Sequence, residues 1–239
     1  TSGVAAGYEH VIPERPGWYA CACCPPNLVR MVTSLGKYVW DEEDDVIYSH
    51  LFIGGDASLA HADIHVESSY PWSGKVSYEV KANTADAFTV AIHIPSYINR
   101  KTLRVCLNGE AVDTQALIRD GYLYVERVWG RTDRITLEFQ MPVRKIYANT
   151  KVREDVGCVA LMRGPVVYCF EGVDNGEELQ ALFVDRELDA TVVNGEGELF
   201  SGMNLLDVAG KRLIYSGGTE LYSEEEPVFE PVKLRAVPY

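Results

Sequence analysis

The sequence predicts a mainly β protein in which two β-sandwich-like domains follow a short helical start. Helical periodicity is confined to the part of the chain before Gly36. From Asp45 onward, apolar and polar residues alternate with a period of two in short runs, and residues typical of turns separate these runs. Strands at this spacing, with almost no helical periodicity among them, indicate sandwiches. We therefore expect domains at 1–44, 45–146 and 147–239.

The helical start follows a cysteine-rich stretch at residues 18–30, which reads W-Y-A-C-A-C-C-P-P-N-L-V-R. Pro25 and Pro26 lack the N–H groups that a first helical turn leaves unsatisfied, so they suit a helix start. Cys23 and Cys24 are therefore expected at a helix N-terminus, where the partial positive charge favours a thiolate. The apolar face of this helix would consist of Leu28, Val29, Met31, Val32 and Leu35.

Two interpretations of these thiols stay open. Adjacent cysteines such as Cys23 and Cys24 rarely form a disulfide with each other, because the bond requires a specific geometry. The spacing C-x-C-C offers up to three soft ligands for Zn²⁺, and at least one further ligand would have to come from elsewhere in the chain. Alternatively, Cys21, Cys23 and Cys24 are buried reduced thiols that pack as small hydrophobic residues.

The first β region begins after an acidic run at 41–45, which we expect to be a solvated loop. Asn108-Gly109 is a strong signal for a tight turn. Runs rich in β-branched and aromatic residues or with period-2 alternation predict strands at 46–53, 60–67, 76–81, 88–94, 103–107, 122–129 and 134–139.

The second β region begins near Tyr147, and Arg163-Gly164-Pro165 separates its first two strands. Long acidic loops are expected at 174–178 and 194–198. Strands are expected at 158–162, 166–170, 211–215 and 232–237. The strand patterns of the two β regions contain three single cysteines, Cys106, Cys158 and Cys169. We expect them to be buried thiols and the compartment to be reducing and cytoplasmic.

The composition is that of a soluble globular chain, with 47% hydrophobic and 24% charged residues among 239. Its 22 basic residues against 35 acidic ones give a net charge of −13, which argues against nucleic acid or an anionic membrane as a partner. A neutral ligand fits this charge better. No apolar run reaches membrane-spanning length, and residues 1–7 lack the charged and apolar regions of a signal peptide.

The motif C-A-C-C-P-P-N-L-V-R, with Trp18 and Tyr19 before it, resembles the cysteine motif of bacterial β-L-arabinofuranosidases in glycoside hydrolase family 127. Other segments resemble the same family in the same order: S-L-G-K-Y at 34–38, Y-P-W-S-G-K-V at 70–76, G-Y-L-Y at 121–124 and A-L-M-R-G-P-V-V-Y-C at 160–169. The resemblance implies that 1–44 is the end of a catalytic (α/α)6 barrel. The two sandwich domains would follow, the second truncated at its C-terminus.

By the same resemblance, Cys23 is the catalytic nucleophile and a zinc ligand, and Cys24 is a second zinc ligand. In the family, the two remaining zinc ligands, a glutamate and a cysteine, lie upstream of this motif. The glutamate that acts as acid and base also lies upstream. Neither Glu9 nor Glu14 matches the sequence context of those residues. Cys21 is expected to be structural, with a ligand role as the alternative. The implied reaction releases L-arabinofuranose from β-L-arabinofuranosides with retention, through a zinc-bound thiolate and a thioglycosyl intermediate.

We therefore expect Zn²⁺ as the cofactor and an arabinofuranoside or related plant-type oligosaccharide as the ligand. Nucleic acid and membrane are not expected as partners. A homodimer is a possible oligomeric state of the chain. The isolated chain is expected to be inactive. Two other classes stay open: a non-catalytic carbohydrate-binding or structural β-sandwich protein, and a zinc-stabilised interaction module.

Two further groups of residues have a functional and a structural interpretation. His61, Asp63 and His65 would share one face of a strand and could present ligands to a metal, although a half-solvated strand shows the same pattern. Tyr70 and Trp72 could stack on a sugar, but packing between sandwich and barrel is favoured. His10 precedes the cysteine motif and is expected in a surface loop.

Overall fold

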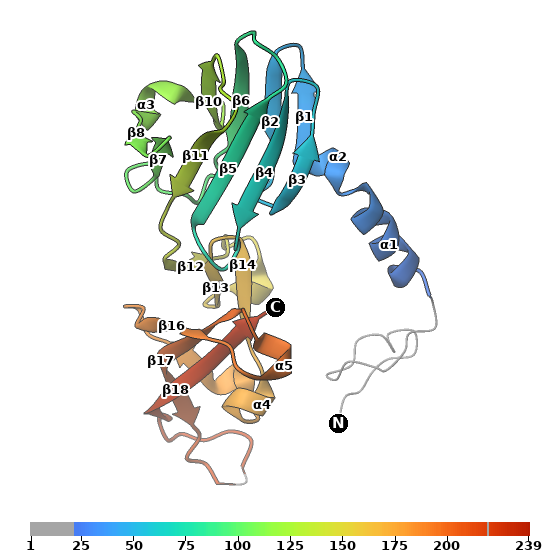
Figure 1. The fold of residues 1–239 in the computed structure, drawn as a ribbon. Coiled ribbons are helices and arrows are strands. Elements are labelled where there is room, and N and C mark those ends of the chain that lie inside the picture. The colour runs from blue at the N-terminus through green and yellow to red at the C-terminus, as the bar shows by residue number, and fades with distance from the viewer. Residues whose placement is uncertain (1–21, 219) are drawn as a thin grey trace.

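The computed structural model describes residues 22–218 and 220–239, and it is mainly β (Figure 1). The described chain starts with helices α1 (Cys24–Ser34) and α2 (Gly36–Val39), and three sheets follow. The fold class expected from the sequence is confirmed. Within the described ranges, none of the helices combines the length and the apolar character that crossing a bilayer requires.

The first two sheets pack face to face as one sandwich. One has the order β1 (Trp40–Glu43), β2 (Val46–Ser49), β6 (Phe88–His93), β10 (Tyr122–Arg127), β9 (Ile118–Arg119). The other has the order β3 (Gly55–Ser58), β4 (Ala62–Ser68), β5 (Lys75–Ala82), β11 (Asp133–Glu138), β7 (Arg104–Leu107), β8 (Glu110–Ala111). Ile47 and Ile92 from the first sheet and Ile64 and Ile135 from the second belong to one buried core.

The third sheet forms a separate C-terminal β unit with its own smaller core (Figure 1). Its strand order is β12 (Val143–Tyr147), β13 (Val159–Arg163), β14 (Val166–Phe170), β18 (Val228–Pro238), β17 (Asn204–Ile214), β15 (Leu182–Val184), and β16 (Ala190–Asn194) also pairs with β17. The short helices of the β regions are α3 (Thr114–Leu117), η1 (Arg153–Asp155), α4 (Gly172–Asn175), η2 (Leu179–Ala181) and α5 (Gly197–Phe200).

Every strand expected from the sequence is present; β14 has the expected ends, and the ends of the others are shifted. The expected loop at 41–45 is wrong, because β1 reaches Glu43 and pairs with β2 through a turn in which Asp44 has a φ of 52°. β1 is an edge strand, so its acidic side chains stay in water while its backbone pairs. The expected loops at 174–178 and 194–198 include parts of α4, β16 and α5.

The change from the sandwich to the C-terminal β unit falls between β11 and β12, since β12 already pairs with β13. This is a few residues before the expected limit at 146/147. The domain limits themselves stay a prediction.

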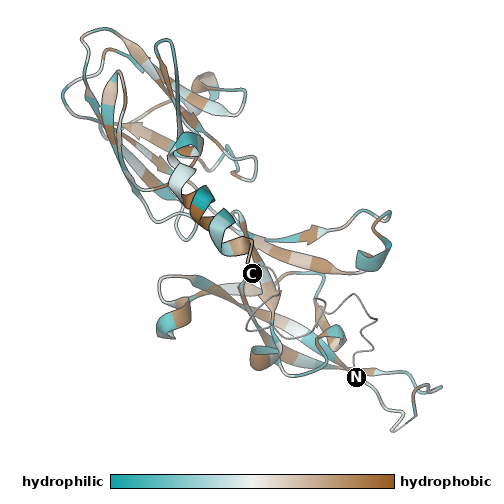
Figure 2. Ribbon diagram, turned by 90° about the vertical axis from the view of Figure 1, so that its right-hand side faces the viewer, coloured by the Kyte–Doolittle hydropathy of each residue, from teal (hydrophilic) through white to brown (hydrophobic). Residues whose placement is uncertain are grey.

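Helix α1 extends away from both β units and has no buried residue (Figure 1). Its apolar residues Leu28, Val29 and Val32 are each more than half exposed. In Figure 2 this helix carries both hydrophobic residues, drawn in brown, and hydrophilic residues, drawn in teal. The helix is therefore amphipathic, and within the described chain its apolar face is open.

The turn at Asn108-Gly109 is confirmed and is held by a buried carboxylate. Both residues have positive φ, 53° and 86°, and they join β7 to β8 as a two-residue hairpin loop. Asn108 accepts a hydrogen bond from the Arg134 amide at 2.8 Å and donates one to Asp133 at 2.6 Å. The Gly130 amide also donates to Asp133, which is only 5% exposed.

Burial alone would raise the pKa of Asp133. The hydrogen bonds from Asn108 and Gly130, together with the charge of Arg127, outweigh burial and hold this pKa below its usual value. The carboxylate is therefore stabilised in its charged form by the fold.

We expect Asp133→Ala to lower the free energy of unfolding by about 1–3 kcal/mol, because the part-buried hydrogen bonds from Asn108 and Gly130 to this carboxylate would be lost. Urea denaturation followed by circular dichroism measures this loss. Glu138→Ala is the matched control, since Glu138 is an exposed carboxylate on the same strand, and it should change the stability by less than about 0.5 kcal/mol.

The Asp133 contribution should depend on pH in a defined direction. Its folded-state pKa is depressed, so the stability it provides is present in full above the ordinary aspartate pKa and is lost as the pH falls through the folded-state value. The gap between wild type and Asp133→Ala should therefore narrow below about pH 4. A gap that widened on acidification would contradict this account.

Candidate functional site

The cysteine pair lies at the start of α1, as the prolines indicated. Cys23 is the residue before the helix, Cys24 is its first residue, and Pro25 and Pro26 follow in the first turn. The side-chain amide of Asn27 donates to the Cys23 carbonyl oxygen at 2.9 Å. The backbone amide of Asn27 donates to the same oxygen at 3.3 Å. These two bonds fix the first turn on which both thiols are carried.

Both thiols are exposed, and their sulfur atoms are 4.0 Å apart. This separation excludes a disulfide between them, whose S–S bond is about 2.05 Å long. Two Zn–S bonds of about 2.3 Å at the tetrahedral angle would place the sulfurs about 3.8 Å apart. The pair therefore fits two ligand positions of one zinc ion. The alternative of buried hydrophobic thiols is wrong for Cys23 and Cys24. The buried position expected of Cys158 is also wrong, because Cys158 is exposed, and Cys106 and Cys169 are only partly buried.

The pair accounts for only half of a tetrahedral zinc shell. In the two described stretches, no group of three or more His, Cys, Asp or Glu side chains is arranged to hold a metal ion. Cys21, Glu9, Glu14 and His10 lie outside the described residues. Further ligands for a metal at the pair would have to come from other segments.

The expected histidine face on β4 does not form a metal site. His65 makes a hydrogen bond of 2.7 Å to Asp56, and both side chains are exposed. His61 lies 3.7 Å from Glu42, while Asp63 points to solvent. The structural interpretation, a half-solvated strand, is the correct one.

Tyr70 and Trp72 have different surroundings. The Tyr70 ring packs against the Phe52 ring at a centroid distance of 5.3 Å. The Tyr70 hydroxyl forms a hydrogen bond with the Tyr97 hydroxyl. Tyr70 is therefore part of the sandwich itself. Trp72 faces the C-terminal β unit, where its carbonyl oxygen accepts a hydrogen bond of 3.2 Å from Arg163.

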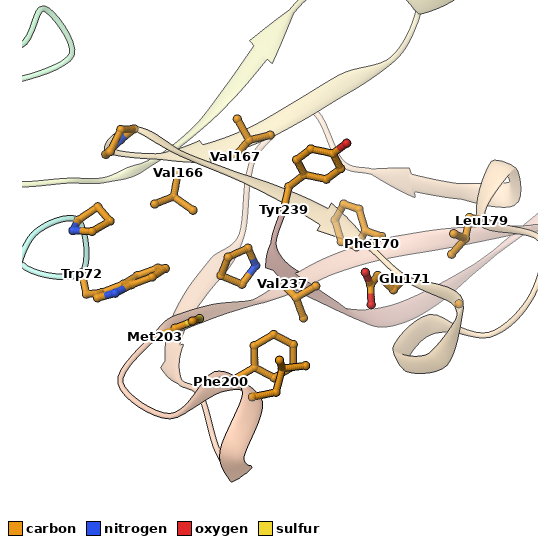
Figure 3. Close-up of a pocket in the computed structure, with 15 residues that line it drawn as sticks. Trp72, Val166, Val167, Phe170, Glu171, Leu179, Phe200, Met203, Val237 and Tyr239 are labelled. Atoms are coloured by element: carbon orange, nitrogen blue, oxygen red, sulfur yellow. The ribbon is translucent and has the colours of Figure 1, made fainter. Parts of the chain in front are cut away.

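Trp72 also lines a cleft of about 1040 Å³ between the sandwich and the C-terminal β unit (Figure 3). Its walls are mostly apolar and include Phe170, Phe200 and Met203. Glu171 is the single charged side chain that lines it. Glycoside hydrolysis commonly requires two carboxyl groups or an equivalent nucleophile and acid, so this cleft by itself does not provide a catalytic pair.

Sequence patterns did not reveal a cluster of aromatic residues on the outer face of the first sheet. Tyr48 on β2 and His50 just after it lie two positions apart, as do Tyr122 and Tyr124 on β10, so each pair points to one side of the sheet. β6 lies between β2 and β10. His93 lies directly opposite Tyr122. The repeated spacing of these rings was the signal that could have identified the cluster.

Comparison with known families matches both β regions. Residues 46–141 match the family model described as β-L-arabinofuranosidase, GH127 middle domain. Residues 143–239 match the model of the glycoside hydrolase family 127 C-terminal domain.

Individual relatives extend the match to almost the whole chain. A non-reducing end β-L-arabinofuranosidase of Bifidobacterium longum is 34% identical over 97% of this chain and 36% of its own length. The crystal structure of a GH127 β-L-arabinofuranosidase from Geobacillus stearothermophilus T6 is 39% identical, with a TM-score of 0.87 over 96% of this chain. A further structure, described as a GH127 β-arabinofuranosidase, is 29% identical with a TM-score of 0.81 over 93% of this chain. The chain spans 36% of the length of each of these relatives.

Proposed function

Because this chain belongs to glycoside hydrolase family 127 and carries its middle and C-terminal domains, we propose that it forms part of a retaining glycosidase. The enzyme would release L-arabinofuranose from β-L-arabinofuranosides. This substrate class follows from the relatives, which are described as β-L-arabinofuranosidases. The zinc site, the nucleophile and the ligand are part of the proposal.

The observation that supports a catalytic role is the pair of exposed thiols at the start of α1, 4.0 Å apart. Cys23 is the proposed nucleophile. Its sulfur forms a bond to the anomeric carbon while the bond from that carbon to the leaving oxygen breaks, and an acid supplied by the upstream catalytic portion protonates that oxygen. The conjugate base of that acid then takes a proton from water while the water oxygen displaces the sulfur, and the product keeps the configuration of the substrate.

Cys23 and Cys24 are also the residues that would hold zinc. When bound, the metal would keep the sulfurs ionised and fix their direction. The chain itself contributes the first turn of α1, where the positive end of the helix dipole favours negative charge and Asn27 donates to the Cys23 carbonyl. The α1 apolar face would pack against the preceding helices of the barrel.

This proposal is tested by the stereochemistry of the reaction. The complete enzyme, meaning this chain together with the upstream catalytic portion, should hydrolyse a chromogenic β-L-arabinofuranoside, and proton NMR at early times should show the β anomer of free arabinose first. Initial formation of the α anomer would contradict a covalent cysteine intermediate. An α-L-arabinofuranoside is the matched control substrate and should remain intact.

A non-catalytic carbohydrate-binding or structural role is the second candidate. The observation that favours it is the absence, within the described part of the chain, of a third side chain placed to complete a metal site at the thiols. Such a protein would bind saccharide without turnover. Assembly as a homodimer and a cytoplasmic location stay predictions.

A further inference from the structure

The outer face of the first sheet carries an aromatic cluster that the proposed reaction does not use. We call it the tyrosine face and define it as Tyr48, His50, His93, Tyr122 and Tyr124. Tyr48 and His50 come from β2 and the residue after its end, His93 ends β6, and the two other tyrosines lie on β10. The opposite side of these strands contributes Ile47, Ile92 and Leu123 to the sandwich core. The tyrosine face therefore points away from the core.

The tyrosine rings lie over the sheet and do not simply extend into water. Ala91 is directly opposite Tyr48 on one side and Tyr124 on the other. It is fully buried, yet it does not belong to the core cluster. The two flanking rings, whose centroids are 6.4 Å apart, therefore cover it. All three tyrosines remain partly exposed, so their rings combine a fixed position with an accessible surface.

Polar contacts hold these rings in place. The Nδ1 atom of His50 and the hydroxyl of Tyr122 are 2.7 Å apart, and the rings of Tyr48 and His50 are nearly parallel. The Arg119 guanidinium lies 4.0 Å above the Tyr124 ring. Ring faces are thus bordered by hydroxyl, imidazole and guanidinium groups that can donate or accept hydrogen bonds.

The charges that border the tyrosine face are of both signs, with Arg119 over Tyr124 and the acidic Asp41 and Glu43 beside Tyr48, so they do not select for an anionic ligand. Asp41 on the neighbouring edge strand lies directly opposite Tyr48. Burial, and to a smaller extent the negative charge of Glu43, raises the pKa of Tyr48, so its hydroxyl stays neutral and can donate. Burial also raises the pKa of Tyr122. A neutral ligand with an apolar face and hydroxyl groups at its rim matches this surface.

A sugar ring has this form, because its C–H groups pack on aromatic rings and its hydroxyls reach polar groups at the ring edges. We propose that the tyrosine face is a saccharide-binding surface that holds neutral L-arabinofuranosyl chains. The choice of sugar rests on the proposed function, whereas the presence of a saccharide surface rests on the rings and their polar rim. A proline-rich peptide also packs on aromatic rings, and the experiment below distinguishes it from a saccharide.

Affinity electrophoresis of this chain tests the proposal. The gel contains an L-arabinofuranose-rich polysaccharide, and a second gel contains dextran. The wild-type chain should be retarded by the first polysaccharide, and Tyr124→Ala should weaken the association at least about tenfold, because it removes the ring beneath Arg119 and one cover of Ala91. Tyr124→Phe keeps the ring and should retain most of the retardation.

The controls separate binding from folding and from catalysis. Tyr222→Ala removes a tyrosine that is 92% exposed elsewhere on the surface and should migrate as the wild type does. Cys23→Ser should also bind normally, since the tyrosine face and the thiols lie on different elements. Circular dichroism checks that Tyr124→Ala is folded.

Equal migration of all variants in both gels would overturn the proposal, as would retardation that folded Tyr124→Ala keeps in full. Capture of a polyproline peptide by the wild type but not by Tyr124→Ala, without retardation by polysaccharide, would overturn it as well. Retardation by dextran alone would overturn the choice of sugar. Retardation of wild type and Cys23→Ser in the first gel supports the surface even if the complete enzyme shows no turnover.

Discussion

Replacing Cys23 by serine in the complete enzyme should lower kcat on a chromogenic β-L-arabinofuranoside by at least about 10³-fold. A serine hydroxyl is not ionised at neutral pH and is a poorer zinc ligand than a thiolate, so both proposed roles of Cys23 would be lost. The fold should remain intact, because Cys23 is exposed and serine is a favoured residue immediately before a helix. Steady-state kinetics and thermal unfolding of the same preparation measure the two effects.

Two cysteine variants complete this test. Cys24→Ser should lose both zinc and activity, because it removes the second proposed ligand. Cys158→Ser is the matched control, since Cys158 is another exposed thiol and lies on the C-terminal β unit. It should retain normal turnover and zinc content. Near-normal turnover of Cys23→Ser would remove the nucleophile assignment.

The isolated chain should bind zinc weakly and should not hydrolyse arabinofuranosides. Cys23 and Cys24 provide two of four tetrahedral ligands, and the described residues contain no group of three that could hold a metal ion. Loss of a positioned general acid alone costs about 10²–10⁴ in rate. Zinc titration with metal analysis after dialysis measures the first effect, and a chromogenic assay measures the second.

The complete enzyme is the positive control in both assays. Tight stoichiometric zinc or measurable turnover by the isolated chain would contradict the expectation. In that case residues before the described part would complete the site, and Glu9, Glu14 and Cys21 would be the first to replace by alanine.

Local sequence signals predicted the start of α1 and the positions of the expected strands. Pro25 and Pro26 mark the helix start by their own covalent structure, so no tertiary contact was needed to identify it. Asn108-Gly109 similarly specifies a tight turn through positive φ angles. These features depend on a few neighbouring residues, and this is why the sequence indicated them correctly.

Features that depend on distant partners were missed. β1 consists mostly of acidic residues and is a strand only because β2 pairs with it. The strand β17 was expected only from Lys211 on, whereas it begins at Asn204 and includes Gly210. A Cβ atom at Gly210 would lie 2.6 Å from Leu234, so the glycine is required there by close packing of β17 against its neighbours.

Only the local part of the candidate site was predicted, because its other features depend on side-chain conformation and on distant residues. The sequence placed Cys23 and Cys24 at a helix start, but the 4.0 Å distance between their sulfurs depends on side-chain conformation. The tyrosine face is assembled from β2, β6 and β10, which are neighbours in the sheet but are separated in the chain by strands of the other sheet. The two-residue spacing within each pair of rings is visible in the sequence, but the strand order that brings the pairs together is not.

The most direct test of the central claim is to identify the atom that carries the sugar during turnover. The complete enzyme is mixed with an activated β-L-arabinofuranoside, quenched in acid at early times, digested and examined by mass spectrometry. The account predicts one pentosyl group on the peptide that contains Cys23, and none on the same peptide of Cys23→Ser. A pentosyl group on a carboxylate, or turnover with the Cys23 peptide unmodified at every time point, would contradict it.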